Sequence, residues 1–358
     1  MNKDQIQADA LLALNKVNKG TAAISMGVGK TMLGLKHMVH NYTDVFKCLV
    51  VAPKLSIFKS WENDAKDFDL EYLMDHVNFT TYLSLNKQSL DYDVIYLDEV
   101  HNLLDSHNSW LSQFKGKIIG LTGTPPRHSN SEKGRMLNKY CPVVYTYITD
   151  DAVEDHILND YEVNVHTLYL DSSKTMLVKT KAKSFYASEL DNYRYWTNRC
   201  NSATSMKEKQ ITRVMRMKAM MEYKSKERLA TEILNKNTEK TIVFANTQDQ
   251  ADRLCTYSYH SNNPQSEDNL EQFKIGNISE LSCVLQLNEG VNIPDLKRGI
   301  ILHSYGNERK LRQRLGRLLR LNPDDTSIID ILCYKDTVDE TWVKNALEDL
   351  DQNKITWL

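Results

Sequence analysis

The sequence predicts an α/β fold of two parallel-sheet lobes, with a helical insertion at the start of the second lobe. Three observations support this prediction. A glycine loop joins an apolar run to a helical pattern at residues 24–39, apolar strands end repeatedly in polar or glycine turns, and the same alternation returns after residue 236. With 358 residues, the chain is long enough for two domains, each with its own core.

The first lobe is predicted to span residues 1–150. A helical pattern over DQIQADALLALNKV precedes the glycine loop and its strand. Four further strands are predicted in the segments KCLVVAPK, VNFTTYLSL, DYDVIYLDEVH and GKIIGLTGTPPR. Between the first two, SIFKSWENDAKDF predicts an amphipathic helix capped by Ser56. Because parallel sheets place their sites at the carboxyl ends of strands, we expect the functional residues to follow these strands.

The second lobe is predicted to begin in residues 151–171, which hold six acidic residues and no Lys or Arg. We interpret this segment as the crossover and the first strand of the lobe. Residues 172–235 predict a long helical segment. Residues 236–358 contain the predicted strands KTIVFA, LSCVLQL, RGIILHS and TSIIDIL, together with the predicted helices SEDNLEQFK, RKLRQRLGRLLR and DETWVKNALEDL.

The composition is that of a soluble globular protein, with 41% apolar and 26% charged residues. No apolar run approaches the roughly 18 residues of a membrane span, and the N-terminus lacks the apolar core of a signal peptide. The six cysteines show no metal-ligand spacing, so we expect reduced, mostly buried thiols and no zinc. These features predict a cytoplasmic protein that has no membrane partner. They do not distinguish a host protein from a phage protein.

One stretch of the chain is strongly basic. The whole chain has a formal net charge of −2, yet residues 172–235 hold 14 Lys or Arg against six Asp or Glu, a net charge of +8. Such a block attracts polyanions. Its aromatic residues either stack on unpaired bases or pack the helices onto the second lobe, and both interpretations stay open for Tyr186, Tyr193, Tyr195 and Trp196.

The glycine loop has the residues of a phosphate-binding P-loop, although Ile24 stands where the general signature has glycine. Gly27 and Gly29 allow the backbone N–H groups to turn inward around phosphates. Lys30 is expected to reach the β- and γ-phosphates of ATP, and Thr31 to hold Mg²⁺. The expected ATP contacts of the loop are Met26, Gly27, Val28, Gly29, Lys30 and Thr31.

Two carboxylates follow the apolar strand VIYL. Asp98 is placed to hold Mg²⁺, and Glu99 can polarise the water that attacks the γ-phosphate. An Asp–Glu pair on its own is usually a solvated acidic turn. The P-loop upstream makes the catalytic interpretation the preferred one.

Four motifs together resemble those of superfamily 2 helicases and translocases. GVGKT, DEVH, TGTPP and QRLGRLLR are similar, in order and spacing, to motifs I, II, III and VI of that family. The resemblance covers nearly the whole chain and implies two RecA-like lobes, a tandem of P-loop NTPase folds. The segment VVAPKLSIFKSWENDAKDF is most similar to Swi/Snf-type double-stranded DNA translocases, whereas GLTGTPPR resembles phage and bacterial recombination-repair helicases.

The resemblance implies roles for further residues. Gln5 would contact adenine, with Gln7 as a second candidate. The segment NEGVNIPD resembles motif V, and its matching ATP-site residues are Glu289 and Gly290. The residues expected to couple hydrolysis to movement on nucleic acid are His101, Thr122 and Thr124.

The segment QRLGRLLR carries the expected catalytic residues of the second lobe. On a helix, Gln313, Arg317 and Arg320 lie at i, i+4 and i+7, so they share one face. Arginines that reach the γ-phosphate from a second lobe raise the rate of hydrolysis by about 10³- to 10⁵-fold. An ordinary basic amphipathic helix would explain the neighbouring basic residues equally well, but it would not explain Gln313 and Gly316.

The nucleic-acid contacts implied by the resemblance lie in both lobes and in the basic segment. They would fall on phosphate and sugar, which predicts binding that is independent of base sequence and sensitive to salt. The expected residues are Pro53, Lys54 and Thr81 in the first lobe, Asn246 and Thr247 in the second, and Lys207, Lys209, Arg213 and Arg216 in the basic segment.

These observations predict an ATP-dependent DNA helicase or translocase that moves on or remodels duplex or branched DNA in repair or recombination. Residues 294–313 leave little room for a strand-separating hairpin, so we expect a minimal motor that depends on a protein partner for targeting. One alternative is an RNA helicase of the same fold. The other is a nucleic-acid-binding module switched by ATP with negligible turnover.

Overall fold

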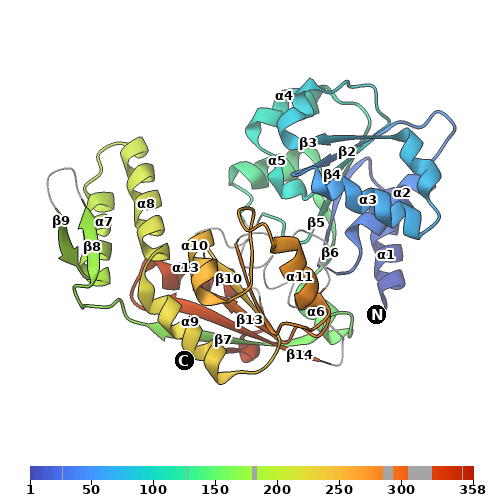
Figure 1. Cartoon of the computed structure of the whole chain (residues 1–358). Helices are drawn as coiled ribbons and strands as arrows, with labels where there is room; N and C mark the ends of the chain where they lie inside the picture. Colours follow the sequence, from blue (N-terminus) through green and yellow to red (C-terminus); the bar gives the residue numbers. More distant parts are fainter. Residues whose placement is uncertain (26, 127, 180–183, 285–292, 305–324, 349) are drawn as a thin grey trace. The chain divides into compact units, whose positions relative to one another are not determined.

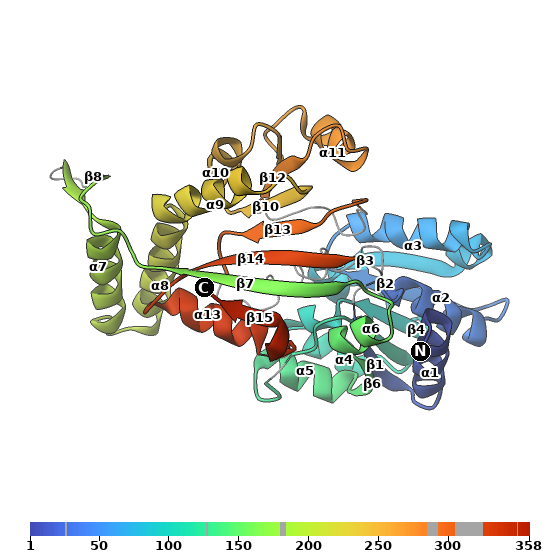
Figure 2. The same ribbon diagram turned by 90° about the horizontal axis from the view of Figure 1, so that it is seen from below.

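The computed structural model describes residues 1–358 except 26, 127, 180–183, 285–292, 305–324 and 349 (Figure 1). The described residues divide into two compact units, residues 1–159 and residues 160 onward. The division falls inside the acidic segment 151–171. Each unit contains a parallel β-sheet with helices packed on it (Figures 1 and 2). The predicted fold class is therefore confirmed.

Unit 1 alternates strands and helices along the chain. Its sheet has the strand order β3-β2-β4-β5-β1-β6, and all neighbouring pairs are parallel. The strands are β1 (Lys19–Ile24), β2 (Cys48–Ala52), β3 (Val77–Thr81), β4 (Val94–Asp98), β5 (Lys117–Thr122) and β6 (Val143–Tyr147). The helices are α1 (Lys3–Asn15), α2 (Lys30–Asn41), α3 (Ser56–Asp67), α4 (Asn108–Gln113), α5 (Glu132–Tyr140) and α6 (Thr149–Glu154).

The central strands of unit 1 are short apolar runs because both faces of the sheet are covered. Every residue of β2 and β4 is buried. Successive residues of a strand point to opposite faces, so continuous burial means that packing occurs on both sides. The segments LVVA and VIYL have the composition that this arrangement requires.

Unit 2 is built on a second parallel sheet, with the order β11-β12-β10-β13-β14-β7-β15 among the described strands. These strands are β7 (Asp160–Leu168), β10 (Thr241–Ala245), β11 (Ser258–Tyr259), β12 (Glu280–Val284), β13 (Arg298–Ile301), β14 (Thr326–Tyr334) and β15 (Ile355–Trp357). A separate antiparallel hairpin consists of β8 (Met176–Lys179) and β9 (Ser184–Ala187). The helices are α7 (Glu189–Asn201), α8 (Met206–Met221), α9 (Lys224–Lys236), α10 (Gln248–Leu254), α11 (Ser266–Lys274) and α13 (Val338–Leu347).

Two local predictions were wrong, and a third was right except for where its strand ends. Within the predicted helical segment, Met176–Lys179 and Ser184–Ala187 form strands, because their apolar and aromatic residues pair with one another, with Leu177 opposite Tyr186. Ser56 is the first residue of α3 and makes no side-chain cap, which leaves Leu55 at the N-cap position. The predicted strand VNFTTYLSL ends at Thr81, where a 3-10 turn begins at Tyr82.

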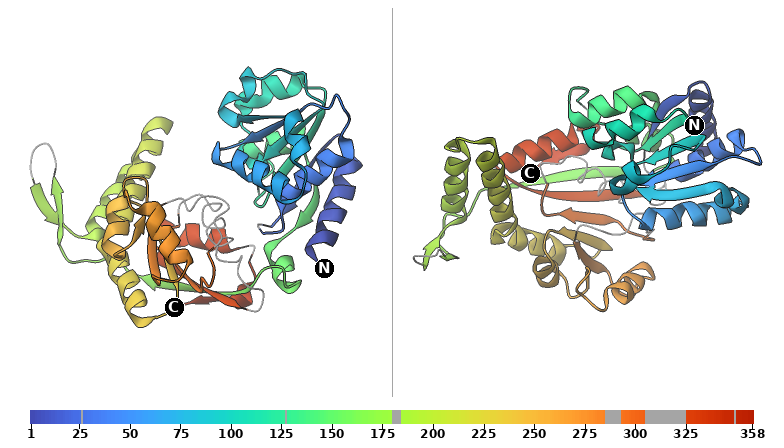
Figure 3. Two further views of the ribbon diagram at one scale, coloured as in Figure 1. Left: turned by 45° about the vertical axis from the view of Figure 1, so that its right-hand side comes forward. Right: turned by 90° about the horizontal axis from the view of Figure 1, so that it is seen from above.

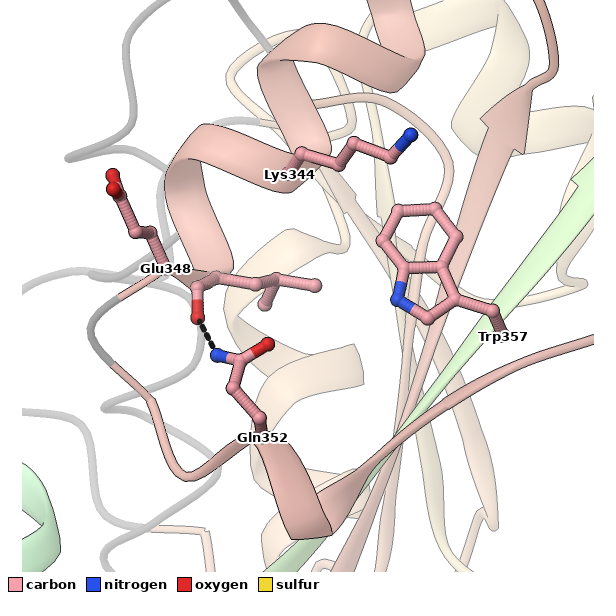
Figure 4. Close-up of a pocket in the computed structure, with 5 residues that line it drawn as sticks. Lys344, Glu348, Gln352 and Trp357 are labelled. Atoms are coloured by element: carbon pink, nitrogen blue, oxygen red, sulfur yellow. Dashed lines mark hydrogen bonds between the residues drawn. The ribbon is translucent and has the colours of Figure 1, made fainter.

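The last strand, β15, was not predicted, and it joins the outer edge of the second sheet beside β7. Three residues are too few to show a periodicity, so only the edge of β7 defines them as a strand. Between β15 and α13 lies a cavity of about 440 Å³, where Gln352 Nε2 donates a hydrogen bond to the Leu347 carbonyl at 3.0 Å (Figure 4). None of the predicted site residues lines this cavity.

All six cysteines are buried and unpaired, as expected for reduced thiols. Burial raises the pKa of Cys48 and Cys141 to about 12, so these thiols stay protonated at neutral pH. No helix within the described parts of the chain is long and apolar enough to cross a membrane.

We predict that His37 makes unit 1 sensitive to acid. His37 is fully buried on α2, its Nδ1 lies 2.8 Å from the Tyr96 hydroxyl, and burial lowers its pKa to about 4. An unfolded chain protonates this residue near its usual pKa of about 6.5, so the free energy of unfolding should fall as the pH drops below that value. The loss reaches on the order of 3 kcal/mol near pH 4.

Urea unfolding of the wild type and His37→Asn at pH 7.0 and 5.0 measures this contribution. The substitution should reduce the loss of stability between the two pH values, whatever it costs at pH 7. His128→Asn, at an exposed position elsewhere in unit 1, is the control. Equal acid sensitivity in the wild type and His37→Asn would contradict the prediction.

Candidate active site

The P-loop lies at the carboxyl end of β1 and leads directly into α2. Gly27 and Gly29 have φ angles of 90° and 93°, in the left-handed region that favours glycine. Gly29 is the N-cap of α2, and no side chain caps the helix. The N–H groups of a first helical turn have no partner within the helix, and together with the positive end of the helix dipole they form a site suited to phosphate.

Gln7 from α1 supports the P-loop. This buried side chain donates from Nε2 to the Val28 carbonyl at 2.7 Å, and its Oε1 accepts from Lys36 Nζ at 2.7 Å. Gln5, the first choice from the sequence, is exposed and donates to Asp9 at 3.0 Å. The structure therefore brings the second candidate, Gln7, to the loop.

Sheet register brings the next two motifs to the same edge as the P-loop. Strand β5 lies between β1 and β4, with Ala23 paired to Thr122 on one side and Asp98 paired to Leu121 on the other. Lys30 Nζ lies 3.7 Å from Glu99 Oε1. Residues from three separate segments of the sequence thus converge on one small region.

Asp98 is buried, and two side chains fix its position. Trp61 Nε1 donates to Asp98 Oδ2 at 3.0 Å, and the Tyr82 hydroxyl donates to the Asp98 carbonyl at 2.9 Å. Burial, reinforced by the neighbouring charge of Glu99, raises the pKa of Asp98 to about 6, while Trp61 and Lys30 act in the opposite direction. A cation bound at this carboxylate would favour the charged form.

Glu99 belongs to a short polar network with two of the predicted coupling residues. It has a left-handed backbone (φ 50°), which is unusual for a residue other than glycine and typical of functional sites. Its Oε2 lies 3.3 Å from His101 Nδ1 and accepts a hydrogen bond from Thr122 Oγ1 at 3.3 Å. His101 Nδ1 lies 2.9 Å from the same hydroxyl, which also accepts from the Thr124 backbone N–H at 3.1 Å.

The residues present fit Mg²⁺ better than a transition metal. The predicted ligands, Thr31 and Asp98, offer a hydroxyl and a carboxylate oxygen, and Mg²⁺ is usually bound by one or two carboxylates together with phosphate oxygens and water. The described residues contain no group of three or more His, Cys, Asp or Glu that could hold a metal by themselves. Such a site would need the phosphates of the nucleotide to complete it.

Several predicted residues lie outside the described part of the chain. They comprise one P-loop position and the expected contributions of motifs V and VI, namely Met26, Glu289, Gly290, Gln313, Arg317 and Arg320. Their roles stay predictions from the sequence.

The predicted nucleic-acid contacts of the two sheets follow strand ends. Ala52, the last residue of β2, pairs with Thr81, the last residue of β3. Pro53 and Lys54 therefore follow β2 at the same edge of the sheet as Thr81. Thr247 caps α10, where its hydroxyl oxygen accepts a hydrogen bond from the Gln250 backbone N–H at 3.2 Å. The cap uses one acceptor position of this hydroxyl.

The basic segment separates into packed and exposed residues. Arg216 donates to Thr197 Oγ1 at 3.3 Å and lies over the Tyr193 ring, and the Tyr193 hydroxyl accepts the Val338 N–H at 3.0 Å. These residues hold the insertion together. Several basic and aromatic side chains of α7, α8 and β9 are exposed, among them Lys207, Lys209, Arg213, Tyr186 and Tyr195.

Sequence reasoning missed Trp61 and Tyr82, which bind the side chain and the backbone of Asp98. Both lie in segments whose periodicity indicates an ordinary core, and buried aromatic residues are usually core residues. No spacing in the sequence relates either residue to Asp98, because the contacts form only when the strands assemble.

Two family models match the chain. The model described as "Type III restriction enzyme, res subunit" matches residues 1–127, and the model described as "Helicase conserved C-terminal domain" matches residues 224–322. Among curated proteins, the chain is 24% identical to the DNA 3'-5' translocase XPB2 of Sulfurisphaera tokodaii, over 91% of this chain and 80% of that protein.

Solved structures share the fold. The ATP-dependent Type ISP restriction-modification enzyme LlaBIII, determined bound to DNA, matches all of this chain with a TM-score of 0.63 at 15% identity. The present chain spans about a third of that enzyme, since 31% of it is covered. The Hef helicase domain of Pyrococcus furiosus matches 96% of this chain and is itself 97% covered, with a TM-score of 0.51 at 14% identity.

We predict that Gly29→Ala destabilises unit 1 more than an equivalent substitution elsewhere. A Cβ at Gly29 would lie 2.6 Å from Gln7 Nε2, whereas Gly276 has a similar positive φ of 84° and open space around it. Gly276→Ala should cost about 1–2 kcal/mol for the left-handed backbone alone. Gly29→Ala should cost more, because it also displaces Gln7.

Chemical denaturation of both variants tests this, and Gln7→Ala in the Gly29→Ala background separates the two costs. Removing the Gln7 side chain should recover the steric part of the loss. Equal destabilisation by the two glycine substitutions would show that Gln7 does not constrain the loop.

Proposed function

Because the chain carries the core of a superfamily 2 helicase or translocase, we propose that it is an ATP-driven motor that moves on or remodels duplex or branched DNA. Two relatives support DNA as the substrate. One is named a DNA translocase, and the other was determined bound to DNA.

The observation that carries the proposal is the network joining Lys30, Glu99, Thr122 and His101. A P-loop alone would serve any nucleotide-binding protein. Here the P-loop lysine lies 3.7 Å from a carboxylate that also contacts His101 and Thr122, two of the three predicted coupling residues. A group placed to activate water is thereby tied to the segment that follows β5, so a change at the γ-phosphate can alter that segment.

In this function the chain's own residues bind and orient ATP. The P-loop N–H groups and Lys30 hold the phosphates, and Glu99 orients the attacking water. Thr31 and Asp98 would hold Mg²⁺, which neutralises phosphate charge. The predicted arginines of the second lobe, Arg317 and Arg320, would stabilise the charge that develops during transfer.

DNA would be gripped through its backbone. Lys54 and Thr81 stand at adjacent strand ends of unit 1, where they can approach successive phosphates, and Asn246 and Thr247 follow β10 in unit 2. The exposed basic residues of α8 would extend this contact. A protein partner that targets the motor is part of the proposal, since a core alone recognises phosphate and sugar but no base sequence.

The first test is the ATPase rate of the wild type and Glu99→Gln. Each is measured without nucleic acid and with single-stranded DNA, blunt duplex DNA, a four-way junction and RNA. Duplex or junction DNA should stimulate the wild type most strongly. Glu99→Gln should lose at least about 10²-fold in rate, the lower range for positioned acid–base groups.

Stronger stimulation by RNA than by any DNA would overturn the proposed substrate. ATP-dependent DNA binding with no turnover in the wild type would overturn the motor and favour an ATP-controlled switch.

A second prediction concerns the basic insertion. Reversing Lys207, Lys209 and Arg213 to Glu should weaken DNA binding and lower the dependence of log K on log salt by up to about three, because each phosphate contact contributes about 0.9. Arg216 is left intact because it packs inside the insertion. Fluorescence anisotropy with labelled duplex DNA at several salt concentrations measures both quantities.

The matched control reverses Lys16, Lys115 and Lys139, which are exposed lysines of unit 1. Lys16 and Lys115 precede β1 and β5, at the amino ends of the strands and away from the proposed site. Equal losses in the two triple variants would show that only the net charge matters, and the insertion would then have no specific role.

A further inference from the structure

Helix α3 contacts the candidate active site at two points that belong to different motifs. Trp61 and Asp64 are three residues apart, so they lie on one face of the helix. Trp61 contacts Asp98 at the end of β4, and Asp64 contacts Thr31 in the first turn of α2. These are the two residues expected to hold Mg²⁺. A single rigid helix therefore touches both predicted ligands.

Trp61 is held on several sides. It is fully buried, and its indole N–H donates to Asp98 Oδ2 at 3.0 Å. A Cβ on Gly34 of α2 would lie 2.3 Å from the Trp61 ring, so only glycine allows α2 to approach this closely. The Tyr96 ring lies 6.0 Å away between centroids. An indole fixed in this way can hold the Asp98 side chain in one orientation.

Asp64 is half-buried on the face of α3 that packs on α2, and the nearby Thr31 side chain opposes the rise in the pKa of Asp64 that burial causes. A threonine hydroxyl has one proton to donate and lone pairs to accept with. If the proton points to Asp64, the lone pairs stay available to a cation. The partner of a metal ligand commonly fixes it in this way and strengthens its binding.

We propose that Trp61 and Asp64 are positioning residues that orient Asp98 and Thr31 for Mg²⁺. Trp61 does so by donating to the carboxylate, and Asp64 does so by accepting the threonine proton. The inference rests on the proposed function, because it takes Thr31 and Asp98 as the ligands of the nucleotide-bound cation. The residues that orient the predicted ligands then lie on α3, outside both the P-loop and the motif at the end of β4.

Direct measurement of cation binding tests the proposal. Free Mn²⁺ is quantified by electron paramagnetic resonance in the presence of the full chain and ADP, with Mn²⁺ replacing Mg²⁺. Asp64→Asn and Trp61→Phe are compared with the wild type. The control is Glu62→Gln, which removes an exposed carboxylate from the same helix. Binding of fluorescent ADP in EDTA measures the nucleotide site without a cation.

Both variants should raise the dissociation constant for Mn²⁺ by about 10-fold or more, the usual effect of losing the partner of a metal ligand. Their affinity for ADP in EDTA should stay unchanged, and Glu62→Gln should match the wild type in both measurements. A purely structural role would instead lower ADP binding in EDTA as well, together with the melting temperature.

Unchanged Mn²⁺ binding in Asp64→Asn overturns the role of Asp64, and unchanged binding in Trp61→Phe overturns that of Trp61. If Trp61→Phe fails to fold, Asp64→Asn decides, since the carboxylate is only half-buried and its amide is nearly the same size. A wild type that binds no ADP with or without Mn²⁺ overturns the proposed function itself, which is a separate outcome.

Discussion

The parallel pairing of β1, β5 and β4 is the constraint on which the candidate active site depends. Its register places Ala23 beside Thr122 and Leu121 beside Asp98, so three loops leave the sheet at nearly the same level. A shift of one residue would turn every side chain of a strand to the opposite face. The buried apolar residues on both faces prevent such a shift. Ordinary core packing thus determines where the carboxylates and the P-loop stand.

The same core makes the site costly to assemble. Asp98 is a carboxylate in a nearly dry environment, and burial disfavours its charged form. The indole of Trp61 and the charge of Lys30 offset part of this cost, and a bound cation would offset more. A buried carboxylate with a strongly perturbed pKa is typical of a functional site, and binding a cation would use the charge of Asp98. The left-handed backbone of Glu99 is a second local cost at the same strand end.

Unit 2 uses buried polar contacts for a different purpose. Lys226 of α9 is fully buried and forms an ion pair with Asp339 of α13, with the Tyr334 ring 4.6 Å from its ammonium group. Glu189 of α7 accepts from the Ser225 N–H at 3.0 Å at the start of α9. These contacts anchor the base of the insertion to the sheet. In its outer part, the paired strands β8 and β9 extend away from the sheet of unit 2 (Figure 3). Basic and apolar side chains of α8 are exposed, as are Leu177, Phe185 and Tyr186 of β8 and β9.

The amino-acid sequence by itself determined the alternation of strands and helices, the P-loop, and the acidic pair at the end of β4. These features follow from local patterns: apolar runs bounded by turns, two glycines before a lysine, and carboxylates after a strand. That Gln7 rather than Gln5 contacts the P-loop followed from neither spacing nor residue type, because this contact depends on which face of α1 packs against the loop. The strands β8 and β9 likewise form only because they pair with each other, and this cross-strand pairing outweighs local propensity.

Only the tertiary structure decided which residues support the catalytic candidates. Trp61 is 37 positions from Asp98 in the sequence, and their hydrogen bond exists because α3 packs on α2 above β4. The same holds for Thr122 and Glu99, which belong to different motifs and meet across neighbouring strands. A sequence records residue types and short spacings. Contacts between distant segments depend on sheet order and register, which the assembled core sets.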